Sequence, residues 1–138
     1  MLKIAVIDGQ GGGIGSYIIK SLREAFGDKI EILALGTNAA ATANMMKCKA
    51  NKGASGENAI IWNVKKVDLI LGPLSILVSN GMMGELTSKM AEAIGSSPAR
   101  KILLPINQEG IDIIGFIKEP LPHLVEKLIL HIKEEFNV

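Results

Sequence analysis

The part of the chain with the greatest potential for chemistry is the glycine-dense segment that follows Asp8. It consists of Gly9, Gln10, Gly11, Gly12, Gly13, Ile14 and Gly15. A phosphate can approach a backbone only where no side chain obstructs it, and free N–H groups at the positive end of a helix dipole then balance its charge. We therefore expect these residues, together with Asp8, to bind a phosphate-bearing ligand or another anion.

The spacing of the glycines narrows the class of ligand. Gly9, Gly13 and Gly15 have the spacing G-x-x-x-G-x-G. This spacing is more similar to the fingerprint of short-chain dehydrogenases/reductases than to the form G-x-G-x-x-G. A phosphate loop of the G-x-x-x-x-G-K-[ST] type is excluded because no Lys stands beside Ser16. The alternative is that the glycines only permit a tight turn and close packing of a helix.

A second candidate position lies about 20 residues further along, where dinucleotide-binding folds place an acidic residue for the ribose hydroxyls. Here the chain reads Gly36-Thr37-Asn38. The missing carboxylate weakens the case for NAD, and the missing Arg or Lys weakens the case for NADP. The sequence therefore does not decide between the two cofactors. Thr37 and Asn38 can still hydrogen-bond a ribose or a phosphate. Alternatively, Asn38 only caps a helix.

Further polar residues follow the expected strands, at the edge where open α/β sheets bind ligands. They are Ser55, Glu57, Asn58, Ser75 and Asn107. We expect them to converge with Asp8 and Thr37 on one crevice. The alternatives are that Asp8 braces the glycine loop and that Glu57 is favoured only by the dipole of its helix.

A short-chain reductase also needs a Tyr and a Lys in the spacing Y-x-x-x-K. Tyr17 is the only tyrosine, and Ser21 stands four residues after it, so this mechanism has no visible acid. Cys48, His123 and His131 have no neighbouring partners in the sequence, and structural roles explain them.

The residues above require a scaffold of alternating strands and helices. Strands are expected at 3–7, 30–35, within 50–55, and at 68–71, 102–104 and 111–116. Helices are expected at 14–25 and 39–47, after Ser55, at 73–78, around 86–94 and from about 120. This pattern predicts an α/β fold, a three-layer Rossmann-like domain over residues 1–138 with strand order 3-2-1-4-5. The last strand is expected to be antiparallel, because 107–110 are too few residues for a parallel crossover.

Composition excludes several classes of function. The 138 residues carry a net charge of +1 and few aromatic residues, which argues against nucleic acid as a partner. No apolar run approaches the ~20 residues of a membrane span. With the single cysteine Cys48 and no secretory leader, a cytoplasmic protein is expected.

Trp62, on the helix after Ser55, suggests an exposed anchor for a homodimer. Met82, Met83 and Met90 suggest a pliable pocket, a subunit contact or ordinary core.

Four segments, at residues 4–15, 34–39, 56–59 and 90–97, resemble a family of small uncharacterised proteins of anaerobic Gram-positive bacteria. The resemblance spans nearly the whole chain. It implies a Rossmann-like architecture with a ligand-binding edge, and it implies no substrate or reaction.

Three hypotheses follow. The first is a binding or sensing module for a dinucleotide or nucleotide phosphate, an NAD(P)-like ligand, at the glycine loop. The second is a small oxidoreductase or other enzyme that uses Asp8, Glu57 or Asn107 and completes its site by dimerisation. The third is an interaction protein without a ligand.

Overall fold

The computed structural model describes residues 1–106 and 108–138. Five parallel strands form one sheet in the order β3-β2-β1-β4-β5, which confirms the predicted order and the short third strand. The strands are β1 (Leu2–Asp8), β2 (Ile30–Gly36), β3 (Lys52–Ser55), β4 (Leu69–Pro73) and β5 (Arg100–Leu104). In the central register, Val6 of β1 lies between Ala34 of β2 and Leu71 of β4.

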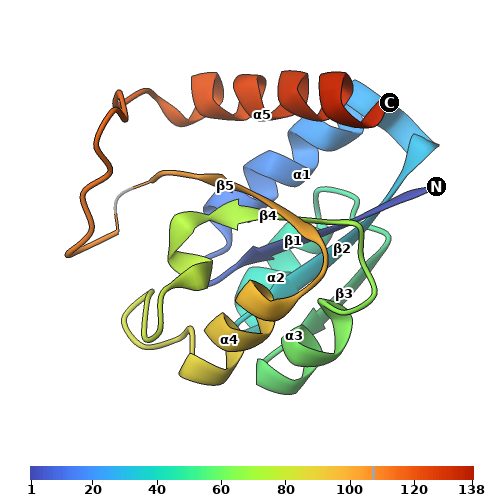
Figure 1. Ribbon diagram of the computed structural model, residues 1–138. Coiled ribbons are helices and arrows are strands. Elements are labelled where there is room, and N and C mark those ends of the chain that lie inside the picture. Colours follow the sequence, from blue (N-terminus) through green and yellow to red (C-terminus); the bar gives the residue numbers. More distant parts are fainter. Residues whose placement is uncertain (107) are drawn as a thin grey trace.

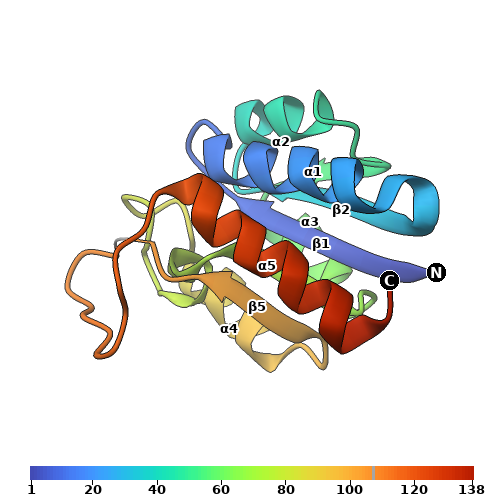
Figure 2. The same ribbon diagram turned by 90° about the horizontal axis from the view of Figure 1, so that it is seen from above.

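Helices cover both faces of the sheet (Figures 1 and 2). They are α1 (Gly13–Phe26), α2 (Ala39–Met46), α3 (Glu57–Asn63), α4 (Ser88–Ser96) and α5 (Leu121–Phe136), with 3-10 turns η1 (Gly27–Lys29) and η2 (Leu74–Leu77). Helices α1, α2 and α5 pack on one face, and α3 and α4 pack on the other. The sequence predicts a helix at 73–78, but the structure has only the 3-10 turn η2 in this segment.

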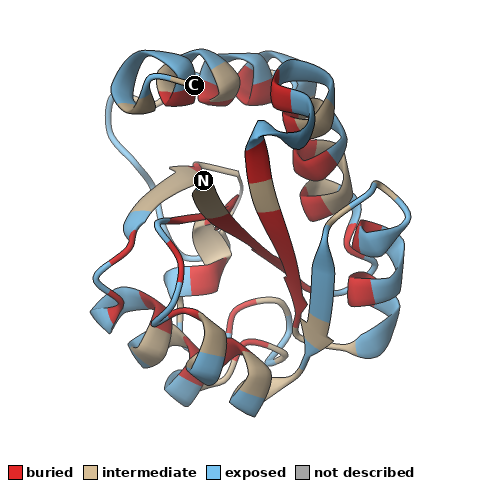
Figure 3. Cartoon of the chain, turned by 90° about the vertical axis from the view of Figure 1, so that its right-hand side faces the viewer, coloured by how far each residue is buried: buried red, intermediate tan, exposed pale blue. Residues whose placement is uncertain are grey.

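The two cores follow from the alternation of side chains along the central strand. Ile4 and Val6 of β1 point toward α1 and α5, whereas Ala5 and Ile7 point toward α3 and α4. All four side chains are fully buried, which explains why β1 reads as a continuous apolar run. Figure 3 shows the buried residues along the strands and on the inner faces of the helices.

The prediction of an antiparallel strand at 111–116 is wrong. Residues 111–116 contain only turns and irregular structure, and Ile113 and Ile114 have 43% and 96% of their surface exposed. Gly110 and Gly115 adopt left-handed backbone angles, with φ of 82° and 87°, and these interrupt an extended run. The segment instead carries the chain from β5 to α5 on the face of α1 (Figure 1).

Candidate functional site

The candidate site lies at the carboxyl ends of β1 and β4, where the strand order reverses. Open α/β sheets bind ligands at such a point because the loops after the two strands diverge. A cavity of about 350 Å³ opens there. Its polar lining is Asp8, Gln10, Ser75, Asn80, Gln108 and Glu109, and its apolar lining includes Ile14, Pro73, Met82, Met83 and Ile106. The structure thus brings together Asp8, part of the glycine loop and Ser75.

Asp8 ends β1 and is almost completely buried. One of its carboxylate oxygens accepts a hydrogen bond from the Gly9 amide at 2.8 Å, and the other accepts one from the Gly15 amide at 2.7 Å. Burial raises the pKa of the carboxyl above its ordinary value of 3.8, although the bonded amides oppose this effect. Asp8 therefore braces the loop against α1 and also borders the cavity.

Most amides of the glycine loop are hydrogen-bonded within the protein. Those of Gly9, Gln10 and Gly15 donate to carboxylates, and that of Gly12 donates to the carbonyl oxygen of Gly9 at 2.8 Å. Among the described residues, none accepts a hydrogen bond from the amide of Gly11 or Gly13. Both glycines are exposed, and a Cβ on either would meet nothing within 4 Å. Two amides at and just before the start of α1 therefore have no acceptor among the described residues and belong to exposed glycines.

Two other glycines of the loop are required by packing. Gly12 has a φ of 71°, and a Cβ there would lie 2.7 Å from the carbonyl oxygen of Ala41. A Cβ on Gly15 would lie 2.5 Å from the sulfur of Met45 and 2.9 Å from Cβ of Asp8. For these two positions, the structure supports the alternative of a tight turn and close helix packing.

Sequence reasoning missed Asn80, Gln108 and Glu109 of the cavity lining, and it also missed Glu85 beside the glycine loop. The carboxylate oxygen Oε1 of Glu85 accepts hydrogen bonds from the Gln10 amide at 2.8 Å, from Oγ1 of Thr37 at 2.7 Å and from Nδ2 of Asn38 at 2.8 Å. These bonds, above all that from the Gln10 amide, lower the pKa of Glu85 below its ordinary value of 4.5. The carboxylate that seemed absent at the end of β2 is therefore supplied by a distant segment, and no local pattern around Glu85 indicates this.

Glu85 belongs to residues 78–87, here named the strap, which connect η2 to α4. The Asn80 amide donates to the carbonyl of Leu86 at 2.7 Å, and Leu86 itself is fully buried. Met82 and Met83 have φ values of 55° and 58°, a left-handed conformation that side chains rarely adopt. Such consecutive strain persists only where the surroundings fix it. The sequence analysis proposed a pocket, a subunit contact or core packing for three methionines. Of these, Met90 is buried in the core and Met83 is 95% exposed.

Asn38 serves two roles at once. Its Oδ1 accepts a hydrogen bond from the Ala41 amide at 2.8 Å and thereby caps α2, as the alternative interpretation predicted. Its Nδ2 donates to the carbonyl of Gln10 at 3.0 Å as well as to Glu85. The side chains of Thr37 and Asn38 therefore lie beside the glycine loop, with their polar atoms engaged by Glu85.

Three predicted site residues lie apart from the cavity. Ser55 donates to Oγ1 of Thr42 at 2.7 Å, at the far edge of the sheet. Oε2 of Glu57 accepts a hydrogen bond from Oγ1 of Thr87 at 2.6 Å, which joins α3 to the end of the strap. Asn58 is exposed on α3 and is not among the residues that line the cavity. Asn107 lies outside the described residues.

The exposed position predicted for Trp62 is confirmed, because 59% of its surface is accessible. The Nζ atom of Lys66 lies 3.7 Å from the centre of its ring. Among the described residues, no group of His, Cys, Asp and Glu side chains could hold a metal ion. Of the helices in the described ranges, none combines the length and the apolar character that a membrane span needs.

Comparison with known proteins gives a family and a remote structural likeness. A family model described as Domain of unknown function (DUF3842) matches residues 3–137. No curated protein matches the chain. Among solved structures, the dodecameric FMN-dependent UbiX-like decarboxylase from Escherichia coli O157:H7 is similar, with 12% sequence identity, a TM-score of 0.48 and coverage of 100% of this chain and 95% of that chain. A likeness this remote carries no argument about what the present chain binds.

Proposed function

The chain belongs to the family described as Domain of unknown function (DUF3842), and we propose that it is a binding module for a nucleotide-type ligand with one phosphate group. The phosphate rests on the amides of Gly11 and Gly13, and the remainder of the ligand enters the cavity beside Asp8 and Asn80. The observation that carries this proposal is the pair of open amides at the start of α1, next to a cavity at the switch point of the sheet.

The start of α1 favours a negative group. The helix has 14 residues, no acidic residue in its first turn, and a glycine in place of a capping side chain. Its dipole places roughly half an elementary charge at this end, and the free N–H groups concentrate that charge. Because neither Gly11 nor Gly13 carries a side chain, a phosphate oxygen can reach both amides directly.

The surrounding charges favour a ligand of low total charge. Asp8 and Glu109 line the cavity, Glu85 lies beside the loop, and the cavity lining within the described ranges contains no Lys or Arg. Each additional phosphate would therefore add repulsion without a matching cation. A volume of about 350 Å³ also lies near the lower end of the roughly 300–1,000 Å³ of small-molecule sites. Both considerations favour a mononucleotide over a dinucleotide or a triphosphate.

The position of the strap also argues against a dinucleotide as the ligand. A Cβ on Gly9 would lie 2.6 Å from the sulfur of Met82 and 3.1 Å from Oε1 of Glu85, so these two side chains cover the end of β1. A dinucleotide that extends from the cavity to the end of β2 would have to displace them. The 2′-phosphate of NADP would also meet the carboxylate of Glu85, which makes NADP the least favoured of the NAD(P)-like ligands.

The test compares pairs of ligands that differ only in the phosphate. Thermal unfolding is followed with FMN and riboflavin, with AMP and adenosine, and with NAD and NADP. A ligand present at 100 times its Kd stabilises a protein by about 2.7 kcal/mol. We expect a stabilisation by at least one of FMN and AMP that the matching nucleoside does not give. Equal stabilisation by both members of each pair would refute the phosphate site, and no effect of any ligand would refute it and favour an interaction protein.

A further inference from the structure

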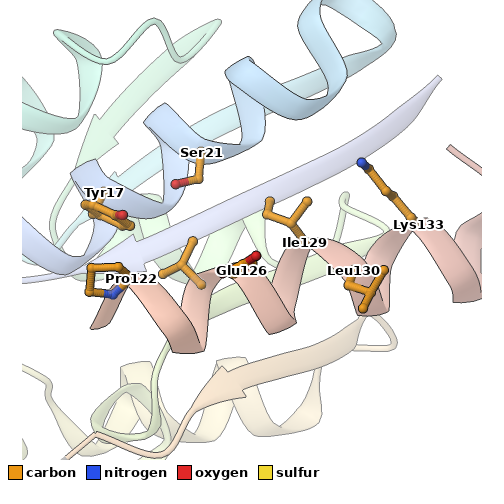
Figure 4. Close-up of a pocket in the computed structure, with 8 residues that line it drawn as sticks. Tyr17, Ser21, Pro122, Glu126, Ile129, Leu130 and Lys133 are labelled. Atoms are coloured by element: carbon orange, nitrogen blue, oxygen red, sulfur yellow. The ribbon is translucent and has the colours of Figure 1, made fainter. Parts of the chain in front are cut away.

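A second concave surface lies between α1 and α5 (Figure 4) and begins at Tyr17, one helical turn after Gly13. This groove has a volume of about 460 Å³. Tyr17 and Ser21 of α1 form one wall, and Glu126, Ile129 and Lys133 of α5 form the other. Figure 4 shows the side chain of Ile129 directed toward α1. Since the groove does not share residues with the candidate site, it needs a separate explanation.

The middle of this surface is apolar and exposed. Leu130 lines the groove with 56% of its surface accessible, and Ile129 beside it is half-buried. Val125 forms the buried floor. An exposed leucine at the edge of a concave apolar surface is a feature of contact sites, although a single exposed leucine needs no explanation on its own.

The charges on the same side of α5 supply the second observation. Glu126 precedes the apolar pair Ile129 and Leu130, and Lys133 follows it, so the opposite charges are placed symmetrically about the centre of the pair. Seven residues of helix separate them by about 10.5 Å, which is too far for a direct ion pair within one chain. In the described part of the chain, neither residue has an ion-pair partner.

Two other charges on this helix are paired, whereas Glu126, Lys133 and Glu134 have no ion-pair partner among the described residues. Lys127 lies 2.6 Å from a carboxylate oxygen of Glu119, and Glu135 lies 3.5 Å from Nη1 of Arg100. Of the unpaired charges on α5, Glu126 and Lys133 are the two that line the groove, one on either side of its apolar centre.

We propose that a second copy of this chain covers the groove, with the two α5 helices antiparallel and related by a two-fold axis that passes between Ile129 and Leu130. In this arrangement Glu126 of each protomer lies opposite Lys133 of its partner. The exposed Leu130 of each protomer enters the groove of the other. An interface of this kind must be self-complementary, because the same patch contributes both sides.

The symmetry of the charges is what identifies the occupant as a second copy. A different protein would need its own pattern of opposite charges at a matching spacing, and nothing would require Glu126 and Lys133 to lie equally far from the apolar centre. An antiparallel copy provides both opposite charges at the correct spacing automatically, at the interaxial distance of 8–10 Å that is usual for packed helices.

The test uses charge reversal and the sedimentation behaviour of the full chain. We expect the wild-type protein to show a concentration-dependent dimer. E126K and K133E should each weaken association about tenfold or more, because each reversal places like charges opposite one another at two symmetric positions. An equimolar mixture of the E126K and K133E proteins should associate as a mixed dimer, since every facing pair is then opposite in charge. The double variant E126K/K133E should also dimerise, to within about threefold of wild type.

Two further variants locate the interface. L130D should produce a monomer, whereas W62S, which changes the exposed aromatic of α3, should leave association unchanged. Circular dichroism melting of each variant shows that it is folded. A wild-type protein that stays monomeric at every concentration, a mixture of the single reversals that fails to associate, or a dimer that W62S disrupts and L130D does not would each overturn the proposal.

Discussion

Thr37 and Glu85 lie side by side although 48 residues separate them in the sequence, with Oγ1 of Thr37 2.7 Å from a carboxylate oxygen of Glu85. The contact fastens the strap to the end of β2. Because the same oxygen also accepts a hydrogen bond from the Gln10 amide, one side chain joins the strap, the glycine loop and the sheet.

Replacement of Glu85 by Ala should loosen the strap. Three donors lose a charged acceptor, so we expect the free energy of unfolding to fall by about 1–3 kcal/mol in urea denaturation. The amide of Gln10 should also exchange its hydrogen faster. The exposed Glu24 of α1 provides the control, and E24A should change stability by less than about 0.5 kcal/mol. Equal effects of the two variants would contradict the role given to Glu85.

The lowered pKa of Glu85 makes its stabilisation depend on pH. The carboxylate has a lower pKa in the folded protein than its ordinary value of 4.5. Its contribution is therefore fully present above pH 4.5 and is lost as the pH falls through the folded value. We expect the difference in unfolding free energy between wild type and E85Q to shrink as the pH falls below 4.5. A difference that stays constant down to the acid transition would be evidence against this assignment.

The raised pKa of Asp8 has the opposite sign. Burial favours the protonated carboxyl in the folded protein, so folding takes up a proton at pH values above 3.8. The stability of wild type relative to D8N should therefore decrease as the pH rises from 3.8 through the folded pKa, and level off above it. Titration of the Asp8 carboxyl carbon by NMR measures that pKa directly. The exposed Asp28, substituted in D28N, serves as the control, and an Asp8 titration at or below 3.8 would disprove the prediction.

Two glycines of the loop should respond to substitution in contrasting ways. At Gly13 a side chain meets open space, so G13L should change stability by less than about 1 kcal/mol while abolishing the stabilisation by a phosphate-bearing nucleotide. At Gly15 a methyl group would lie 2.5 Å from the sulfur of Met45, and we expect G15A to cost about 1–3 kcal/mol. Urea denaturation with and without nucleotide measures both effects. Undiminished nucleotide binding by G13L would place the phosphate elsewhere.

The sheet order could be predicted because its determinants are local. The continuous apolar run of β1, the glycines after it and the helical spacing of Ile18 and Leu22 each indicate an element directly, and short connections limit the topology. The same reasoning fails for the isoleucines of 111–116, because apolar β-branched residues favour a strand by their local pattern. Their exposure and the left-handed Gly110 and Gly115 show that pairing, which the local pattern does not contain, decides whether a strand forms.

The candidate site was only partly accessible to sequence reasoning for a related reason. Asp8 ends β1, Thr37 and Asn38 follow β2, and parallel strands bring their ends together. Glu85 follows no strand and reaches the loop only because Leu86 anchors the strap in the core. Ser55 also ends a strand, but β3 is at the edge of the sheet, and Ser55 does not line the cavity.

The position of β5 at the end of the sheet bears on how the protein behaves when it is concentrated or stored. In the described ranges, β5 is hydrogen-bonded to β4 alone, so the backbone groups along its other side can template a strand from another molecule. The strand is only five residues long and begins with Arg100 and Lys101, and clustered positive charge on a short terminal strand discourages such growth. Neutralisation of those two side chains should therefore promote fibrillar aggregation even if the native fold is unchanged.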